Sequence, residues 1–330
     1  MTQHFMTLDA AEAAVQKINH RRVATRIDQL TINPFHNTEG EIQIDVKNEE
    51  GRTMHCAPFA ERSILKAVGV GRRLLDGAKD DIDLLERALD KGKRMAREDG
   101  MVVLTVTGND EIQCVTPGDG LPLSLPEVWN VVKHEKGLQG VVDIPDLSRG
   151  RYDLRLVTDR ESSPRRNVGD ITMAGVRVSI DSTIKLNPFI YRLACANGMQ
   201  RVEDGDVLEI DMGDPIASLR ASYAHVADLS VQFGMDFASS DDVRIPNPTD
   251  WALRALRIAR APAKIRAAIA ERIPREAPNG TLYEVLNVVT AIARERSDKP
   301  RVRNRLESVA GRVLAMQAGT MSCPSCGSHS

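Results

Sequence analysis

Residues 167–201 are the part of the chain that most narrows what it can fold into. Apolar and polar residues alternate there in two runs, a pattern typical of strands with one buried face. Between the runs, residues 181–183 are Asp, Ser and Thr, which favour a turn. We therefore expect a β-hairpin, in which Pro188 limits the second strand to a sheet edge or a bend and Asn197-Gly198 closes the segment. The alternating apolar residues are Val176, Val178 and Ile180 in the first run and Ile184 and Leu186 in the second.

A helix is expected at the start of the chain. Asp9 and Glu12 have the spacing of a capping box, and apolar residues follow at roughly helical intervals as far as Leu30. The pattern stops before Asn33-Pro34, because the helical conformation is disfavoured for a residue that precedes a proline. The sequence therefore predicts an amphipathic helix within residues 1–34.

The rest of the chain divides into a strand-rich part and a helical part. We expect an α+β protein with a mostly antiparallel sheet, flanked by helices, within residues 35–212. Residues 213–318 keep helical spacing and are expected to pack on the sheet as a helical C-terminal part, and residues 319–330 are expected to form a flexible tail. Among the C-terminal helices, Thr281 and Glu284 predict a capping box. The segments with strand character outside the central hairpin are 41–47, 101–107, 111–115, 152–156 and 207–212.

Composition excludes several classes of protein. Of the 330 residues, 42% are hydrophobic and 27% are charged, which is the balance of a soluble globular chain. Apolar runs are short, so no membrane span is expected, and the first residues lack the pattern of a secretory signal. The five cysteines do not form a disulfide framework, which favours a reducing cytoplasm.

The net charge of −2 conceals an uneven distribution along the chain. Residues 251–330 contain 14 Lys and Arg against 6 Asp and Glu, a balance of +8. Residues 1–250 hold the remaining 30 basic and 40 acidic residues, a balance of −10. The basic end permits a polyanion as partner, and the alternative is a set of helices solvated by arginine.

Arginines also cluster in the strands and loop around Asn167. Guanidinium groups fork onto phosphates and stack on bases, and Tyr152, Phe189 and Tyr191 supply aromatic rings in the same region. The alternative is a solvated face whose arginines form local ion pairs. The arginines predicted to contact nucleic acid are Arg151, Arg155, Arg165, Arg166, Arg177 and Arg192.

Arg192 lies between residues that are expected to be buried, so its guanidinium needs a partner. The candidates are Asp170, Asp181 and a ligand phosphate, and we favour a structural carboxylate partner over a ligand.

The end of the chain carries a C-x-x-C-x-x-H pattern formed by Cys323, Cys326 and His329. These side chains can bind zinc, but a closed structural site needs four ligands. We therefore expect a disordered tail and predict no metal and no cofactor.

Three segments carry a resemblance to a known family. GDITMAGVRVSID, PFIYRLACANGM, and TLYEVLNVVTAIA with LESVAGRVL are similar to the phage- and plasmid-like proteins classed as Domain of Unknown Function nine hundred thirty-two. The matching elements are Gly169-Asp170, residues 192–198 and residues 281–287, and the similarity covers roughly residues 35–318. The chain departs from the family pattern at Ile180-Asp181-Ser182, where such proteins carry an asparagine-serine-glutamate turn. The resemblance implies phage, prophage or plasmid origin and no established activity.

The arginines and the mobile-element resemblance together favour a non-enzymatic protein that binds or anneals single-stranded nucleic acid and works as a homo-oligomer. Two alternatives stay open. One is a hydrolase or nuclease that uses carboxylates, and the other is a phage protein that acts by protein interaction or by countering host defence.

Overall fold

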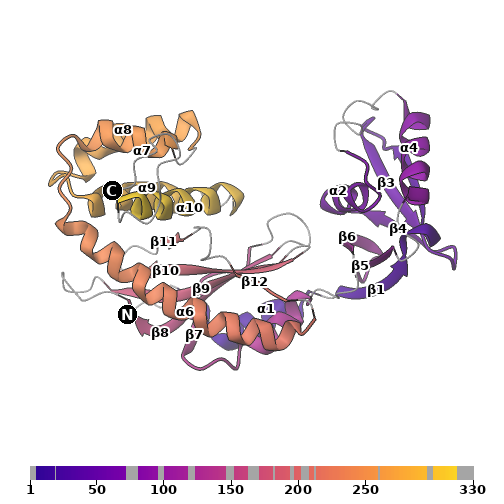
Figure 1. Ribbon diagram of the computed structural model, residues 1–330, viewed down its shortest axis with the longest axis horizontal. Coiled ribbons are helices and arrows are strands. Elements are labelled where there is room, and N and C mark those ends of the chain that lie inside the picture. The colour runs from indigo at the N-terminus through magenta and orange to yellow at the C-terminus, as the bar shows by residue number, and fades with distance from the viewer. Residues whose placement is uncertain are drawn as a thin grey trace.

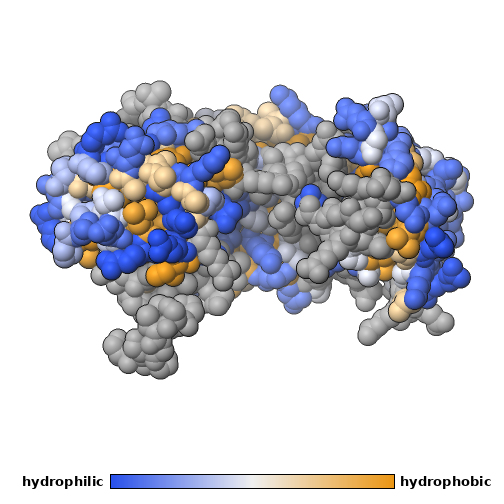
Figure 2. All heavy atoms as spheres, turned by 90° about the horizontal axis from the view of Figure 1, so that it is seen from above, coloured by the Kyte–Doolittle hydropathy of each residue, from blue (hydrophilic) through white to orange (hydrophobic). Residues whose placement is uncertain are grey.

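The computed structural model describes residues 5–18, 20–71, 81–95, 100–117, 123–145, 152–162, 171–180, 183–193, 197–201, 208–211, 213–258, 261–295 and 300–317. Within these ranges the protein combines two mostly antiparallel sheets with helices and ends in a helical part, which confirms the expected α+β class. The first sheet lies at one end of the molecule, and the second sheet lies nearer its middle, below the C-terminal helices (Figure 1). Seen from above, hydrophilic residues predominate at both ends, with smaller apolar patches among them (Figure 2). No helix in the described ranges is long and apolar enough to cross a membrane.

The first sheet, with the helices described beside it, forms what we call the N-terminal lobe, residues 20–117. Its strands follow the order β1-β5-β6-β4-β3-β2, and all neighbours are antiparallel except the parallel pair β4 and β6. Helices α2 (Pro58–Ala67) and α4 (Ile82–Met95) share one core cluster with these strands. The strands expected at residues 101–107 and 111–115 are present as β5 and β6, which pair antiparallel. The strands are β1 (His20–Arg26), β2 (Thr31–His36), β3 (Ile42–Lys47), β4 (Thr53–Cys56), β5 (Met101–Thr107) and β6 (Glu111–Pro117), with a 3-10 turn η1 (Ile27–Gln29) after β1.

The second sheet, with the helices packed on it, forms what we call the second lobe, the described residues within 5–18 and 123–317. Its strands follow the order β11-β10-β9-β8-β7, with β12 also paired to β10. The predicted central hairpin is confirmed as β9 and β10, with Ile180 opposite Ile184. Asn197-Gly198, expected to close the segment as a turn, instead begins β11 and pairs with β10. Leu154 and Val178 face each other on the side that packs on α6 (Pro215–Ser239). Helices α1 (Leu8–Gln16) and α5 (Leu125–Val132) belong to the same core cluster. The strands are β7 (Leu138–Val141), β8 (Tyr152–Glu161), β9 (Thr172–Ile180), β10 (Ile184–Arg192), β11 (Asn197–Gln200) and β12 (Leu208–Glu209).

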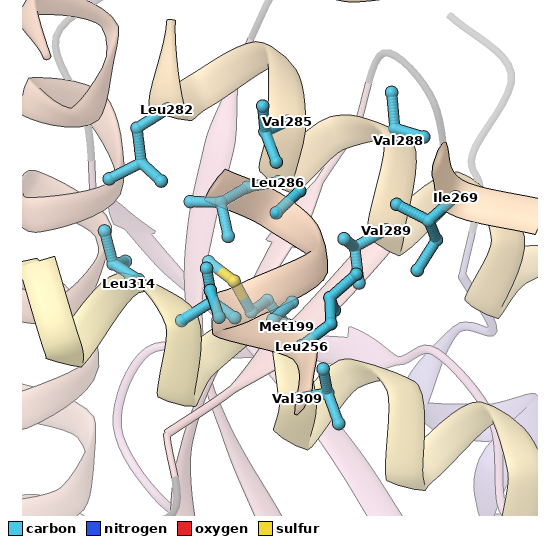
Figure 3. Close-up of a cluster of buried hydrophobic side chains, with 14 of the residues drawn as sticks. Met199, Leu256, Ile269, Leu282, Val285, Leu286, Val288, Val289, Val309 and Leu314 are labelled. Carbon is cyan, nitrogen blue, oxygen red and sulfur yellow. The ribbon is translucent and has the colours of Figure 1, made fainter. Parts of the chain in front are cut away.

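The C-terminal helices enclose an apolar cluster of their own, into which β11 inserts Met199 (Figure 3). Leu256 enters it from α7, Ile269 from α8, Leu286 from α9 and Val309 from α10. The predicted capping box is present, because the Glu284 backbone N–H donates to the Thr281 hydroxyl at 3.2 Å and Glu284 accepts from the Thr281 N–H at 3.3 Å. After the 3-10 turn η2 (Ser240–Asp242), the helices are α7 (Pro248–Ile258), α8 (Ala263–Glu276), α9 (Leu282–Arg294) and α10 (Pro300–Gln317).

The predicted N-terminal helix is wrong after its first turns. Helix α1 ends at Gln16, and His20–Arg26 form β1, which places Val23 opposite Leu104 of β5. Over so short a stretch, the apolar residues from Val23 to Leu30 fit both the spacing of a helix and the alternation of a strand. Pairing with the apolar strand β5 decides in favour of a strand.

Two further expectations about the sheet need correction. The strands expected within residues 41–212 are divided between two sheets and do not form one. Strand β10 also continues through Pro188 without a bend, paired with Val176 of β9 on one side. On the other side, β12 pairs with residues 185–186 and β11 with residues 189–192, so Pro188 occupies the gap where no ladder N–H is needed.

Candidate functional site

The structure separates the arginines that were expected to form one nucleic-acid surface. Arg151, Arg165 and Arg166 lie outside the described residues. Arg155 and Arg177 are opposite each other on β8 and β9, on the face of the sheet turned away from α6. Arg192 ends β10 and contacts a different helix.

Arg155 is enclosed between the sheet and α10. Its side chain is 2% exposed, and its Nη1 and Nη2 atoms lie 2.9 Å and 2.8 Å from the two carboxylate oxygens of Glu307. It also donates to the side-chain oxygen of Asn304, and its guanidinium carbon lies 5.8 Å from the centre of the Phe189 ring. This placement excludes Arg155 from a nucleic-acid surface, because the guanidinium has no exposed side to offer a phosphate.

Arg177 is likewise committed to internal partners. Its Nη2 atom donates to both carboxylate oxygens of Asp153, at 2.8 Å and 2.7 Å, and its Nη1 atom donates to Gln200. Asp153 has no exposed surface and also accepts from the Ser179 hydroxyl at 2.7 Å and from the Asn304 amide at 2.5 Å. Arg177 is therefore the cation that neutralises a buried carboxylate.

These contacts belong to one connected set, which we call the interlayer network. Its charged members are three guanidinium groups and three carboxylates, so its formal charges cancel. Gln200 extends the set by donating to the Asn304 carbonyl oxygen at 2.7 Å. The network members are Asp143, Asp153, Arg155, Arg177, Gln200, Arg303, Asn304 and Glu307.

Burial governs the electrostatics of the network. It raises the pKa of Glu307, and the guanidinium groups of Arg155 and Arg303 oppose that rise. Burial also disfavours the charged form of Arg155, but the carboxylates of Glu307, Asp143 and Asp153 outweigh it and raise the pKa of this guanidinium. A balanced set of this kind joins α10 to the sheet, and the formal charges of its described members cancel.

Arg192 has the partner that its position demanded, although neither Asp170 nor Asp181 is described. Its Nη1 atom donates to the side-chain oxygen of Asn287 at 2.8 Å, and its guanidinium carbon lies 5.2 Å from the centre of the Tyr283 ring. Both partners belong to α9, so Arg192 joins β10 to the C-terminal helices. Asp170 and Asp181 lie outside the described residues, so the carboxylate partner that we favoured stays a prediction.

A different group of basic residues is exposed on α7 and α8, at the end of the molecule opposite the N-terminal lobe (Figure 1). Arg254 and Arg257 lie one turn apart on α7, and Lys264 lies in the first turn of α8. None of the three forms an ion pair in the part of the chain that the structure describes. Trp251 lies about one turn before Arg254 and is half-buried, and Ile258 is 50% exposed. We call these five residues, Trp251, Arg254, Arg257 and Ile258 of α7 and Lys264 at the start of α8, the basic ridge.

The sequence pointed to these residues only through their total charge. Their alternation with buried Ala255 and Leu256 marks them as the outer side of an amphipathic helix. The network residues of α10 were missed, although Asn304, Glu307 and Gly311 form a polar and small stripe at helical spacing beside an apolar one.

Metal ligation has no support in the described ranges, where no group of three or more His, Cys, Asp or Glu side chains could hold an ion. Cys323, Cys326 and His329 lie outside them.

Comparison with known proteins identified no relative of this chain. No family model matches it, and no curated protein and no solved structure is significantly similar to it. The resemblance to the phage and plasmid family therefore stays a prediction.

Proposed function

We propose that the protein binds single-stranded nucleic acid, without catalysis, through the basic ridge of α7 and α8. The observation that carries this proposal is the group formed by Arg254, Arg257 and Lys264, whose charges are exposed and not neutralised by described carboxylates. Cations of this kind release counterions from a phosphate backbone, which is the main source of affinity in non-specific binding.

The apolar members of the ridge favour single strands over duplex. Unpaired bases present flat faces that stack on aromatic rings and pack on aliphatic groups. Trp251 and Ile258 lie on the same side of α7 as Arg254, at spacings of three and four residues. Phosphates and bases of one strand therefore have partners on one helix.

The carboxylate alternative has weaker support. The buried carboxylates at the centre of the second lobe, Asp153 and Glu307, are bound by guanidinium groups and are closed off from substrate. A role on a mobile element in the cytoplasm, as the family resemblance implies, is compatible with binding the single strands that arise in replication and recombination.

The salt dependence of binding tests the proposal. Replacing Arg254, Arg257 and Lys264 together by alanine should weaken binding to a labelled single-stranded oligonucleotide and reduce the slope of log affinity against log salt by about 2, since each lost single-strand phosphate contact removes about 0.7. Fluorescence anisotropy over a salt series measures both quantities.

A matched control removes three exposed basic residues elsewhere, Lys47, Arg62 and Lys136, none of which forms an ion pair in the described ranges. The control should keep the wild-type slope. Equal slopes for wild type and the ridge variant, or equal losses in both variants, would refute the ridge as the binding surface.

A further inference from the structure

We propose that α4 is a self-association surface, through which two copies of the chain pack antiparallel about a two-fold axis. This helix lies on the outer side of the N-terminal lobe, far from the C-terminal helices (Figure 1). The inference does not depend on nucleic-acid binding.

Helix α4 has a second apolar side besides the one that faces the core. Leu85 and Leu89 are buried in the lobe, which accounts for one side. Leu84, Ala88, Lys91 and Met95 follow each other at spacings of four, three and four residues and form a separate stripe. Leu84 is 41% exposed and Met95 is 74% exposed, so both ends of the stripe reach the surface of the described residues. We call these four residues the seam.

The seam is palindromic, which suits contact with a second copy of itself. In an antiparallel pair, Leu84 lies opposite Met95 of the partner subunit, and Ala88 lies opposite Lys91 of the partner subunit. The small Ala88 leaves room for the aliphatic stem of the lysine, whose ammonium group reaches solvent. A polar residue at one position of an apolar seam lowers affinity but fixes the register.

The charges beside the seam are also self-complementary. Asp83, Arg87, Asp90 and Arg94 form an exposed stripe, and none of them makes an ion pair in the described ranges. A two-fold axis perpendicular to antiparallel helices brings this stripe beside the same stripe of the partner in reverse order. Asp83 then lies within one turn of Arg94 of the partner subunit, and Arg87 lies within one turn of Asp90 of the partner subunit.

A cleft on the other side of the seam offers space for the partner's side chains. Its volume is about 550 Å³, and the described lining includes Ala88, Gly92 and Met95 of α4 with Val68 and Val70 beyond the end of α2. Gly92 lets α4 approach the end of α2 in the same chain, since a Cβ at Gly92 would lie 2.2 Å from the Val68 carbonyl oxygen. The lining also includes Lys66 and Lys91, and its apolar part suits the side chain of Leu84 of the partner subunit, which reaches this end of α4 in the antiparallel register.

The contact area between the two copies of α4 is small, and this area limits the affinity of the dimer. Fourteen residues of helix span about 21 Å, and a single pair of such helices buries less than a standard interface. We therefore expect a reversible dimer that forms in the micromolar range and weakens as salt screens the charged stripe.

Charge-swap variants of the full chain, studied without nucleic acid, test the proposal. Arg87→Glu with Arg94→Glu makes the stripe wholly acidic, and Asp83→Lys with Asp90→Lys makes it wholly basic. Sedimentation equilibrium should show wild type changing from monomer to dimer as its concentration rises through the micromolar range, with each variant alone remaining monomeric. An equimolar mixture of the two variants should recover the dimer, which also proves that both are folded.

A control variant carries two charge reversals on another helix, Arg254→Glu with Arg257→Glu, and should dimerise like wild type. The proposal fails if wild type stays monomeric throughout the micromolar range. It also fails if the mixed variants associate no better than each variant alone.

Discussion

At the scale of single residues, Glu61 shows how position sets the chemistry of a side chain. Burial on α2 raises its pKa to about 7 from the usual 4.5, while a backbone hydrogen bond with Ile44 and the charge of Arg62 oppose the rise. The folded state therefore prefers the protonated carboxyl. The resulting contribution to stability is complete below pH 4.5 and is lost as the pH rises through about 7.

Glu61→Gln should therefore leave stability nearly unchanged at acid pH and increase it above pH 7, because the amide mimics the protonated carboxyl and cannot ionise. Thermal melts of both proteins across this range measure the difference. Glu86→Gln, at an exposed position on α4, serves as the control and should show no such trend. A gain of equal size at every pH would contradict the assignment to ionisation.

The sequence predicted which residues need partners better than it predicted the partners themselves. Arg192 required a polar contact, and one such contact among the described residues is Asn287, which is 95 residues away in the sequence. The alternation of β8 marked Leu154 and Leu156 as buried, and it suggested an exposed face for Asp153 and Arg155. That face is covered by α10, so every side chain from Tyr152 to Thr158 is buried. Strand patterns do not show whether another element covers the polar face.

At the scale of elements, α10 is joined to the sheet by charge as well as by apolar contact. Gly311 allows the close approach, because a Cβ there would lie 2.0 Å from the Gln200 carbonyl oxygen. Glu307 and Arg155 then form a buried pair across the junction. Burying such a pair removes both charged groups from water, which offsets much of the free energy gained from their attraction. Loss of one partner is nevertheless strongly destabilising, because the other charge then stays buried without a counter-charge.

Arg155→Met alone should destabilise the protein by about 3–5 kcal/mol, because it leaves the Glu307 carboxylate buried without its main cation. Adding Glu307→Leu should recover a large part of that loss, since two apolar side chains can occupy the same space. Denaturant unfolding of the single and double variants measures the coupling. Additive losses from Arg155→Met and Glu307→Leu would mean that the two side chains act independently.

The local sequence predicted a helix or a strand correctly where the apolar residues followed only one of the two spacings. The central hairpin and the capped start of α9 follow from residues close together in the chain, and both are confirmed. The error at β1 arose where short apolar runs fit two periods and a distant strand decided the outcome. The local sequence therefore predicts whether a segment forms a helix or a strand better than it predicts which other segments pack against it.

At the scale of the whole molecule, strand pairing divides the chain into two lobes that the sequence did not reveal. Strand β1 pairs with β5, and β4 pairs in parallel with β6, so both contacts join segments far apart in the chain. No local pattern distinguishes the strands of one sheet from those of the other. Residues 5–18 precede the N-terminal lobe in the sequence, but their buried side chains belong to the core of the second lobe.

The cores of the two lobes are separate, which predicts independent loss of structure. The core cluster of the N-terminal lobe lies within residues 20–117 and shares no member with the three clusters of the second lobe. Leu104 is fully buried in the first core, and Leu286 is fully buried among the C-terminal helices. Removing either side chain should cost its own lobe about 2–5 kcal/mol, the usual range for a buried leucine replaced by alanine.

Hydrogen exchange read by mass spectrometry can assign the loss to a lobe. Leu104→Ala should accelerate exchange in β1 to β6 and leave α6 to α10 at the wild-type rate, and Leu286→Ala should do the reverse. The ion pair between Arg22 and Glu127, at 2.5 Å, joins the lobes but is partly exposed, so it contributes too little to couple their unfolding. Faster exchange across both lobes in either variant would show instead that the two cores unfold as one cooperative unit.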